Sequence, residues 1–415
     1  MSEEMKNLNN EPEQAPVEKE EAKKPLDKKN IIIIAAAAVV VVVAIVLALV
    51  LGGGNQPADN NGGNDNGGEN GGEEGGETLN EYYLGMGTVV NLDSSKTGTA
   101  QLDVTVATVV VDASGKIVAC RIDVAQNKVD ITDGYVTVPS EFKTKMELGS
   151  AYGMGQPEPL PADKAWMDNN GDGKVLEWNE QAKAFEAWCV GKTLAQVKNL
   201  IAEGNLNNVN GHWISTDADL LAAGCTIQIS EFVNAVEKAF NDDQKATFKS
   251  NGEFTLGLGV DSYDDGSADA EDEDGVVKVY SNMAAVVKAG DKTLAVLNDA
   301  IQPTISFDIA GDITAKTFKG TKRELKEDYG MGGKPYSPDN DGDGRVLEWY
   351  VQSAAFSAHV TGKTVAEIEA LGADENLQNK NDHWITTDAD LLAAGCTIQI
   401  GAIVDVVVEA ANNAR

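Results

Sequence analysis

Apolar positions follow two different patterns along this chain. Residues 31–51 read IIIIAAAAVVVVVAIVLALVL, an unbroken run of 21 apolar side chains. A helix of about 20 such residues spans the hydrocarbon core of a bilayer. Residues 100–124 instead alternate between apolar and polar side chains on both sides of a turn at Ser114 and Gly115, and residues 276–299 do the same around Gly290 and Asp291. Alternation of this kind predicts β-hairpins.

Helical patterns follow each predicted hairpin. In the first half of the chain, one helix is expected to begin near Glu177 and a second at Thr193, because threonine is a favourable N-cap. Strand-like segments followed by helices are typical of an α+β fold, in which helices and strands are segregated.

Long stretches of the sequence occur twice. YGMG stands at residues 152–155 and 329–332, and DNNGDGKVLEW at 168–178 corresponds to DNDGDGRVLEW at 339–349. Residues 212–229 and 383–400 differ at one position of 18. The sequence therefore predicts tandem duplicated α+β domains over residues 81–245 and 250–415, each of a usual domain size.

The segments around the apolar run predict a membrane-anchored protein. Lys23, Lys24, Lys28 and Lys29 precede the run, and no basic residue lies between residues 52 and 80. The positive-inside rule therefore places residues 1–30 as a disordered cytoplasmic tail, residues 31–51 as a single transmembrane helix and the repeats on the extracytosolic side of the cell membrane. Residues 52–80, rich in glycine, asparagine and glutamate, are expected to be a flexible linker.

Composition narrows the classes of function. Lys and Arg number 33 against 66 Asp and Glu, a net charge of −33 that argues against nucleic-acid binding. Four cysteines do not make a disulfide framework, and three histidines argue against a histidine-rich metal site. Cys120 and Cys189 occur only in the first repeat, where either a disulfide or two buried thiols fits the sequence.

Each repeat carries a short helical pattern followed by a run of small residues and a threonine. In the first repeat, Thr216 is expected to cap this helix, Asp219 to be its third residue and Gly224 to take the left-handed conformation at its end. Residues 225–229 are expected to form a short strand, and Ser230 to cap the last helix. The segments are Ala223-Gly224-Cys225-Thr226 and Ala394-Gly395-Cys396-Thr397. Small residues admit a phosphate close to the backbone, but the same pattern also suits a helix end that leads into a buried strand.

These motifs carry a family resemblance that covers the whole outer region. LGMGTVV (84–90), IDVAQNKVDI (122–131), ELGSAYGM (147–154), EWNEQAKAFEAWCVGKT (177–193) and TDADLLAAGCTI (216–227) resemble the duplicated extracytosolic flavoproteins of Gram-positive bacteria. These are similar to the pheromone-lipoprotein electron carriers of extracellular electron transfer. In that family a flavin transferase attaches FMN through a phosphoester to a threonine.

The resemblance implies a cofactor site in each repeat. Thr226 and Thr397 are the implied acceptors, and Asp219 and Asp390 match the motif aspartate. Ala and Cys stand where the family motif has Ser and Ala. The implied electron donor is a membrane quinone or NADH dehydrogenase, and the acceptors are external. Further candidates around the flavin are Gly224, Gly395, Cys225, Cys396, His212, His383, Trp213 and Trp384, with Trp178, Trp349, Tyr152 and Tyr329 as other aromatic faces.

The aspartate-rich segments at residues 168–173 and 339–344 resemble the first half of a calcium-binding loop. Oxygen-bearing side chains at alternate positions converge on one cation, a glycine makes the turn and the next residue offers its carbonyl. The twelfth position is Asn179 or Tyr350 instead of an acid, and an acid stands at the tenth. The expected ligands are Asp168, Asn170, Asp172, Lys174 and Glu177 in the first repeat and Asp339, Asp341, Asp343, Arg345 and Glu348 in the second.

Three classes of function fit these observations to different degrees. The first is an electron-transfer flavoprotein without its own substrate pocket. The second is a calcium-stabilised cell-surface binding or structural protein without a redox role. The third is an enzyme, but the sequence contains no recognisable nucleophile–base pair or paired-carboxylate array in support of it.

Overall fold

The computed structural model describes residues 79–209, 211–332, 344, 346–380 and 383–415. The predicted tail, transmembrane helix and nearly all of the linker lie outside these residues. Among the helices that the structure describes, none combines the length and apolar composition needed to cross a bilayer. The described residues form one compact unit.

The first half of this unit is built on a five-stranded antiparallel sheet with the order β4-β3-β2-β1-β7. The predicted turn at Ser114 and Gly115 is confirmed, because it joins the two long central strands. Strand β7 lies after residue 245, the predicted end of the first repeat, but it pairs with β1. The first sheet therefore extends past that predicted boundary. The strands are β1 (Asn80–Asn91), β2 (Thr99–Asp112), β3 (Ile117–Thr132), β4 (Tyr135–Thr137) and β7 (Ala246–Ser250).

The second half contains a sheet around one 15-residue strand, β9 (Gly275–Ala289). One edge of β9 pairs with β8. The other edge pairs with β10 along one part of its length and with β11 along another, and β12 pairs with β11. The turn at Gly290 and Asp291 between β9 and β10 is confirmed. The other strands are β8 (Thr255–Asp264), β10 (Lys292–Ile301), β11 (Thr304–Phe307) and β12 (Ile313–Thr317).

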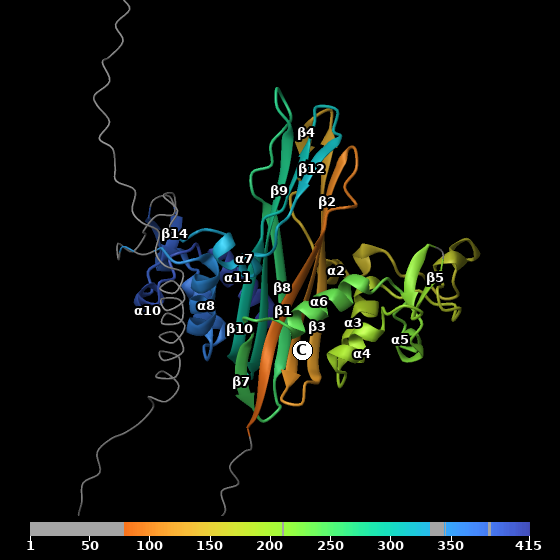
Figure 1. Cartoon of the computed structure of the whole chain (residues 1–415), viewed down its shortest axis with the longest axis horizontal. Helices are drawn as coiled ribbons and strands as arrows, with labels where there is room; N and C mark the ends of the chain where they lie inside the picture. Colours follow the sequence, from red (N-terminus) through yellow and green to blue (C-terminus); the bar gives the residue numbers. More distant parts are fainter. Residues whose placement is uncertain (1–78, 210, 333–343, 345, 381–382) are drawn as a thin grey trace, which may run out of the picture. The chain divides into compact units, whose positions relative to one another are not determined.

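Helices cover the outer face of each sheet, so the described unit is an α+β fold (Figure 1). In the first half these are α2 (Lys145–Leu148), α3 (Trp178–Cys189), α4 (Leu194–Asn199), α5 (Ala218–Ala222) and α6 (Ser230–Phe240), with a hairpin of β5 (Leu206–Val209) and β6 (His212–Ser215). In the second half they are α7 (Lys322–Leu325), α8 (Trp349–Val360), α9 (Val365–Leu371), α10 (Ala389–Ala393) and α11 (Gly401–Asn412), with a hairpin of β13 (Leu377–Lys380) and β14 (His383–Thr386). Short 3₁₀ turns occupy Gly149–Tyr152, Ala162–Met167, Lys326–Asp328 and Asp374–Asn376.

The inner faces of the two sheets pack against each other. Val104 and Val106 of β2 belong to one apolar cluster with Leu256 of β8 and Met283 of β9. Val109, which points the other way, packs under the helices of the first half. Both faces of β2 are therefore covered over its second part, where the burial pattern is continuous and not alternating. The shared cluster explains why the two halves form a single compact unit.

Candidate functional site

The predicted acceptor turn begins at the end of α5. The N-cap of α5 is Asp217 and not Thr216 as predicted, because the Asp217 carboxylate accepts the Leu220 N–H at 2.9 Å. Asp219 is consequently the second helical residue. Gly224 has φ +85° after the helix, so the left-handed conformation expected there is confirmed. A Cβ at Gly224 would lie 2.5 Å from Cδ1 of Leu176.

The segment between this turn and α6 is irregular instead of the expected strand. Ser230 is the first residue of α6, and Ile229 is its N-cap, so the predicted serine cap was also wrong. The reason lies in tertiary contacts, because the Thr226 N–H bonds to a side chain and not to a neighbouring strand.

A buried glutamine holds each predicted acceptor. The Gln181 Oε1 atom accepts the Thr226 N–H at 2.8 Å and lies 3.3 Å from Thr226 Oγ1. Its amide nitrogen donates to the Leu176 carbonyl at 2.9 Å. Thr226 is 5% exposed, so its hydroxyl lies just below the surface.

The second half repeats these contacts almost unchanged. Gln352 Oε1 accepts the Thr397 N–H at 2.7 Å, and its amide nitrogen donates to the Leu347 carbonyl at 2.7 Å. Gly395 has φ +80°, and Asp388 caps α10 as Asp217 caps α5. Sequence reasoning missed both glutamines, although the repeated Glu-Trp-x-x-Gln pattern at the start of α3 and α8 contains the signal.

The predicted calcium loop of the first half packs against the acceptor turn. Asn169 Nδ2 donates to the Thr226 carbonyl at 3.0 Å, and Asn170 Nδ2 lies 3.4 Å from the Leu221 carbonyl. These two contacts bring together two motifs that are more than 50 residues apart in the sequence.

Asp168 organises this loop. Its Oδ1 accepts the N–H groups of Gly171 at 2.7 Å and Asp172 at 3.1 Å, and its Oδ2 accepts the Gly173 N–H at 2.9 Å. Asp172 Oδ1 accepts the Lys174 N–H at 2.8 Å. Carboxylate oxygens have further lone pairs, so these bonds preform the loop without using up its capacity for a cation.

Glu177, an expected calcium ligand, is the N-cap residue of α3. Its carboxylate accepts the Met154 N–H of the YGMG segment at 3.0 Å. Glu348 accepts the Met331 N–H in the same way at 2.8 Å. Over the described ranges, no group of three or more His, Cys, Asp or Glu side chains is arranged to hold a metal. Asp339, Asp341, Asp343 and Arg345 lie outside the described residues.

The cysteines beside the acceptors are core residues. Cys225 and Cys396 are both buried, and burial raises the pKa of each thiol to about 12. Such thiols remain protonated and are poor nucleophiles at neutral pH. Cys120 and Cys189 are free and buried, so the structure has two buried thiols here and not a disulfide. Their counterparts Val296 and Val360 are buried too.

The aromatic candidates divide into two groups. Trp178 and Trp349 are each 3% exposed and belong to the two helix-covered cores. Trp213 and Trp384 are 49% and 52% exposed on the hairpins that precede α5 and α10. His212 Nδ1 lies 3.3 Å from Gln228 Oε1, a contact that joins β6 to the segment just after Thr226.

A lysine lies over the core aromatic rings in each half. Lys145 Nζ is 5.0 Å from the Tyr152 ring centroid and 5.4 Å from that of Trp178. Lys322 Nζ is within 4.7 to 5.4 Å of the Tyr280, Tyr329 and Trp349 rings, and burial lowers the pKa of this amine to about 8. Sequence analysis did not single out either lysine.

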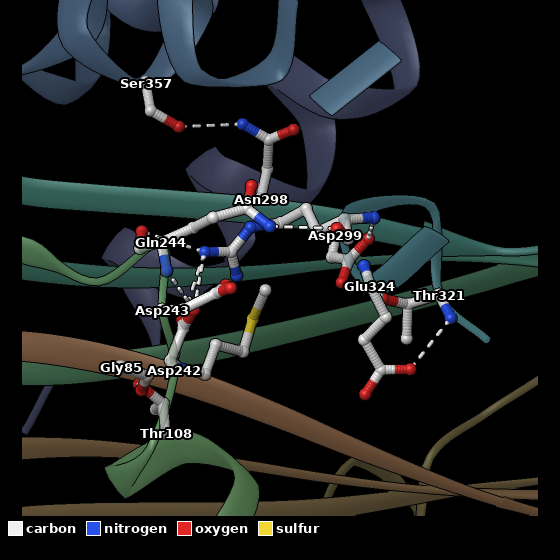
Figure 2. A network of polar contacts seen from close by, with 12 residues as sticks. Gly85, Thr108, Asp242, Asp243, Gln244, Asn298, Asp299, Thr321, Glu324 and Ser357 are labelled. Atoms are coloured by element: carbon white, nitrogen blue, oxygen red, sulfur yellow. Dashed lines mark hydrogen bonds and ion pairs between the residues drawn. The ribbon is translucent and has the colours of Figure 1, made fainter. Parts of the chain in front are cut away.

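A cavity of about 340 Å³ lies elsewhere, where the two halves meet. Figure 2 shows part of its polar wall, which includes Asp242 and Asp299, and a guanidinium pairs there with the Asp242 carboxylate. That group belongs to Arg323, whose Nη2 donates to Asp242 Oδ1 at 3.1 Å and Oδ2 at 3.0 Å and to the Gln244 carbonyl at 2.9 Å. None of the predicted site residues lines this cavity.

Compared with protein-family models, curated proteins and solved structures, the chain matches none.

Proposed function

We propose that this chain is a membrane-anchored extracytosolic electron-transfer flavoprotein, with FMN attached covalently to Thr226 and Thr397. The observation that carries the proposal is the pair of acceptor turns. In each half a glycine with positive φ leads into a threonine whose backbone N–H is held by a buried glutamine. The proposal includes a single membrane-spanning helix at residues 31–51, a tandem duplication of one α+β unit, a flavin transferase and a membrane dehydrogenase as donor.

The residues around each acceptor fit a group attached at the surface. Ala222 and Ala223, which are exposed, stand four and three positions before Thr226 in the sequence. Gln181 would hold the Thr226 backbone N–H while Oγ1, which lies 3.3 Å from the same amide oxygen, carried the phosphoester. The glutamine would thus position the threonine for attachment.

Bound flavin supplies one- and two-electron redox chemistry, and a covalent bond prevents its loss outside the cell. The chain's own task is to fix the attachment point and the surroundings of the ring. Exposed flat faces are available at Trp213 and Trp384. Because the two acceptor turns belong to one compact unit, both groups would travel together on the same tether.

Calcium is the second part of the proposal. The loop around Asp168 is ordered by backbone N–H groups and donates through Asn169 to the carbonyl of Thr226. A cation held by Asp168, Asn170 and Asp172 would stiffen the segment that supports the acceptor turn. The same loop also supports the alternative function, a calcium-stabilised surface protein without a redox role.

Covalent flavin distinguishes the two functions. The full chain, produced together with a bacterial flavin transferase, should retain yellow fluorescence on a denaturing gel, and its mass should exceed the sequence mass by two FMN groups. A double variant with Thr226→Ala and Thr397→Ala should lose both. Lys198→Ala with Glu369→Ala is the matched control, since both residues are exposed at equivalent positions of α4 and α9. A colourless wild-type chain of unmodified mass would eliminate the flavoprotein.

A further inference from the structure

A set of exposed residues in the segment around each acceptor is the same in both halves. It consists of Trp213, Thr216, Asp219, Ala222, Ala223 and Gln228 in the first half and Trp384, Thr387, Asp390, Ala393, Ala394 and Gln399 in the second. All twelve residues are exposed. We call this surface the tryptophan face.

Identity at these positions is not required by the fold. Buried residues of the same segment, such as Ile214 and Leu220, repeat because each fills an equivalent core position. An exposed position has no such constraint, and tryptophan is one of the side chains enriched in protein–protein interfaces relative to the rest of the surface. Trp213 and Trp384 are 49% and 52% exposed, yet both halves have tryptophan there.

The neighbouring helices show how freely other exposed positions differ. Lys198 of α4 corresponds to Glu369 of α9, which reverses the charge. Gln196 corresponds to Glu367, and Asn199 to Ala370. All these positions are exposed in both halves. Divergence on α4 and α9 contrasts with identity on the tryptophan face, although the two regions lie in the same part of each half.

We infer that the tryptophan face is the surface by which the flavin transferase binds each half of this chain. This inference rests on the proposed function. One enzyme that modifies both Thr226 and Thr397 must find the same contacts beside each acceptor, and only three residues separate Ala222 from Thr226. Tryptophan is the side chain most enriched among residues that dominate binding energy, and a polar rim of threonine, aspartate and glutamine suits a transient complex.

The transfer itself balances as a phosphoryl substitution. The Thr226 Oγ–H bond breaks, and Oγ forms a new bond to the phosphorus that carries the flavin. The phosphoanhydride bond of flavin adenine dinucleotide breaks at the same phosphorus and releases AMP. The hydroxyl proton leaves to solvent, and no electron changes hands. The tryptophan face takes no part in these bonds and acts by holding the transferase over the turn.

The duplication provides an internal control for the test. In the full chain with Trp213→Ala, produced with a flavin transferase, the rate of FMN attachment at Thr226 should fall at least tenfold while that at Thr397 stays unchanged. Trp384→Ala should give the reverse. Mass spectrometry of the two acceptor peptides at successive times measures both rates in the same molecule.

Lys198→Glu is the matched control, because it introduces the charge that the other half already has at the equivalent exposed position. Equal labelling of Thr226 and Thr397 in the Trp213→Ala chain would overturn the inference while leaving the flavoprotein intact. Absence of label at both threonines in the wild-type chain would instead overturn the proposed function. Should Trp213→Ala lower the melting temperature, Ala222→Glu tests the same face from α5, outside the hairpin.

Discussion

At the scale of single residues, the proposed acceptor threonines depend on side chains that belong to other elements. Gln181 is 1% exposed and joins α3 to both Thr226 and the Leu176 carbonyl. A buried polar group that loses its partner costs about 1–3 kcal/mol, which is more than a typical hydrogen bond contributes. The glutamine therefore acts as a positioning residue for the turn.

Gln181→Leu should lower the free energy of unfolding by at least about 2 kcal/mol, because it leaves the Thr226 N–H and the Leu176 carbonyl unpaired. Urea denaturation followed by circular dichroism measures the loss. Lys183→Leu, at an exposed position of the same helix, should change stability by less than about 0.5 kcal/mol. Similar losses in the two variants would contradict the positioning role.

A buried carboxyl makes stability depend on pH. Asp123 Oδ1 accepts the N–H groups of Val124 at 2.7 Å and Met146 at 3.1 Å, and burial raises the pKa of this carboxyl to about 6. The native protein therefore holds this proton up to about pH 6, whereas the unfolded chain releases it near the ordinary pKa of 3.8. The native state binds more protons in that window, so this group's contribution falls as pH rises from 4 to 6.

Asp123→Asn keeps the accepting oxygen and removes the charge. Its stability relative to the wild type should rise by about 2 kcal/mol between pH 4 and pH 7, which is most of the free-energy equivalent of the raised pKa. Denaturation curves at four pH values measure this difference. A constant difference across the range would show that the carboxyl titrates normally.

At the scale of elements, backbone geometry shapes the acceptor turn. The short helix α5 ends at a glycine whose positive φ redirects the chain toward Gln181, and the same geometry recurs after α10. Two expected local features were wrong. The N-cap of α5 is Asp217 and not Thr216, and residues 225–229 form no strand because the Thr226 N–H donates to the Gln181 side chain and not to a neighbouring strand.

Gly224→Ala should cost about 2 kcal/mol, since alanine is strained at φ +85° and its Cβ would lie 2.5 Å from Leu176 Cδ1. Gly191→Ala is the matched control. Gly191 has φ +81° with no atom within 4 Å of the new Cβ, so it reports the backbone strain alone, about 1 kcal/mol. Thermal and urea unfolding of the two variants should rank them in this order, and the opposite ranking would contradict the role of Leu176.

The loop around Asp168 predicts a response to calcium. Calcium should raise the melting temperature relative to a sample in excess chelator, and the combination of Asp172→Asn with Asp343→Asn should abolish that increase. Asp163→Asn, an exposed acid just before the first loop, should leave the increase intact. Identical melting curves with calcium and with chelator would rule the cation out.

At the scale of the whole molecule, apolar packing and a buried ion pair join the two halves. The inner faces of the sheets share one apolar cluster. Beside it, Arg323 of α7 reaches Asp242 with both side chains only 7% exposed. An unpaired buried charge costs far more than an unpaired surface charge, so this pair couples the halves strongly.

Arg323→Met should lower the free energy of unfolding by about 3–5 kcal/mol, because the Asp242 carboxylate stays buried without its partner. Lys326→Met is the matched control. Lys326 pairs with Asp243 at the surface, with side chains 38% and 65% exposed, and its loss should cost no more than about 1 kcal/mol. Equal effects would mean that Asp242 is solvated in the folded protein.

The sequence by itself determined the strand and helix periodicities, the two hairpin turns, the α+β class and the candidate acceptor and calcium motifs. These follow from local rules, since alternation, caps and glycine positions act within a few residues. Only the tertiary structure decided that both faces of β2 are buried, that β7 completes the first sheet, that Gln181 holds Thr226 and that Asn169 joins the aspartate loop to the acceptor turn. Such contacts join residues that are tens of positions apart, and which side chain meets which backbone group depends on how the sheets and helices pack.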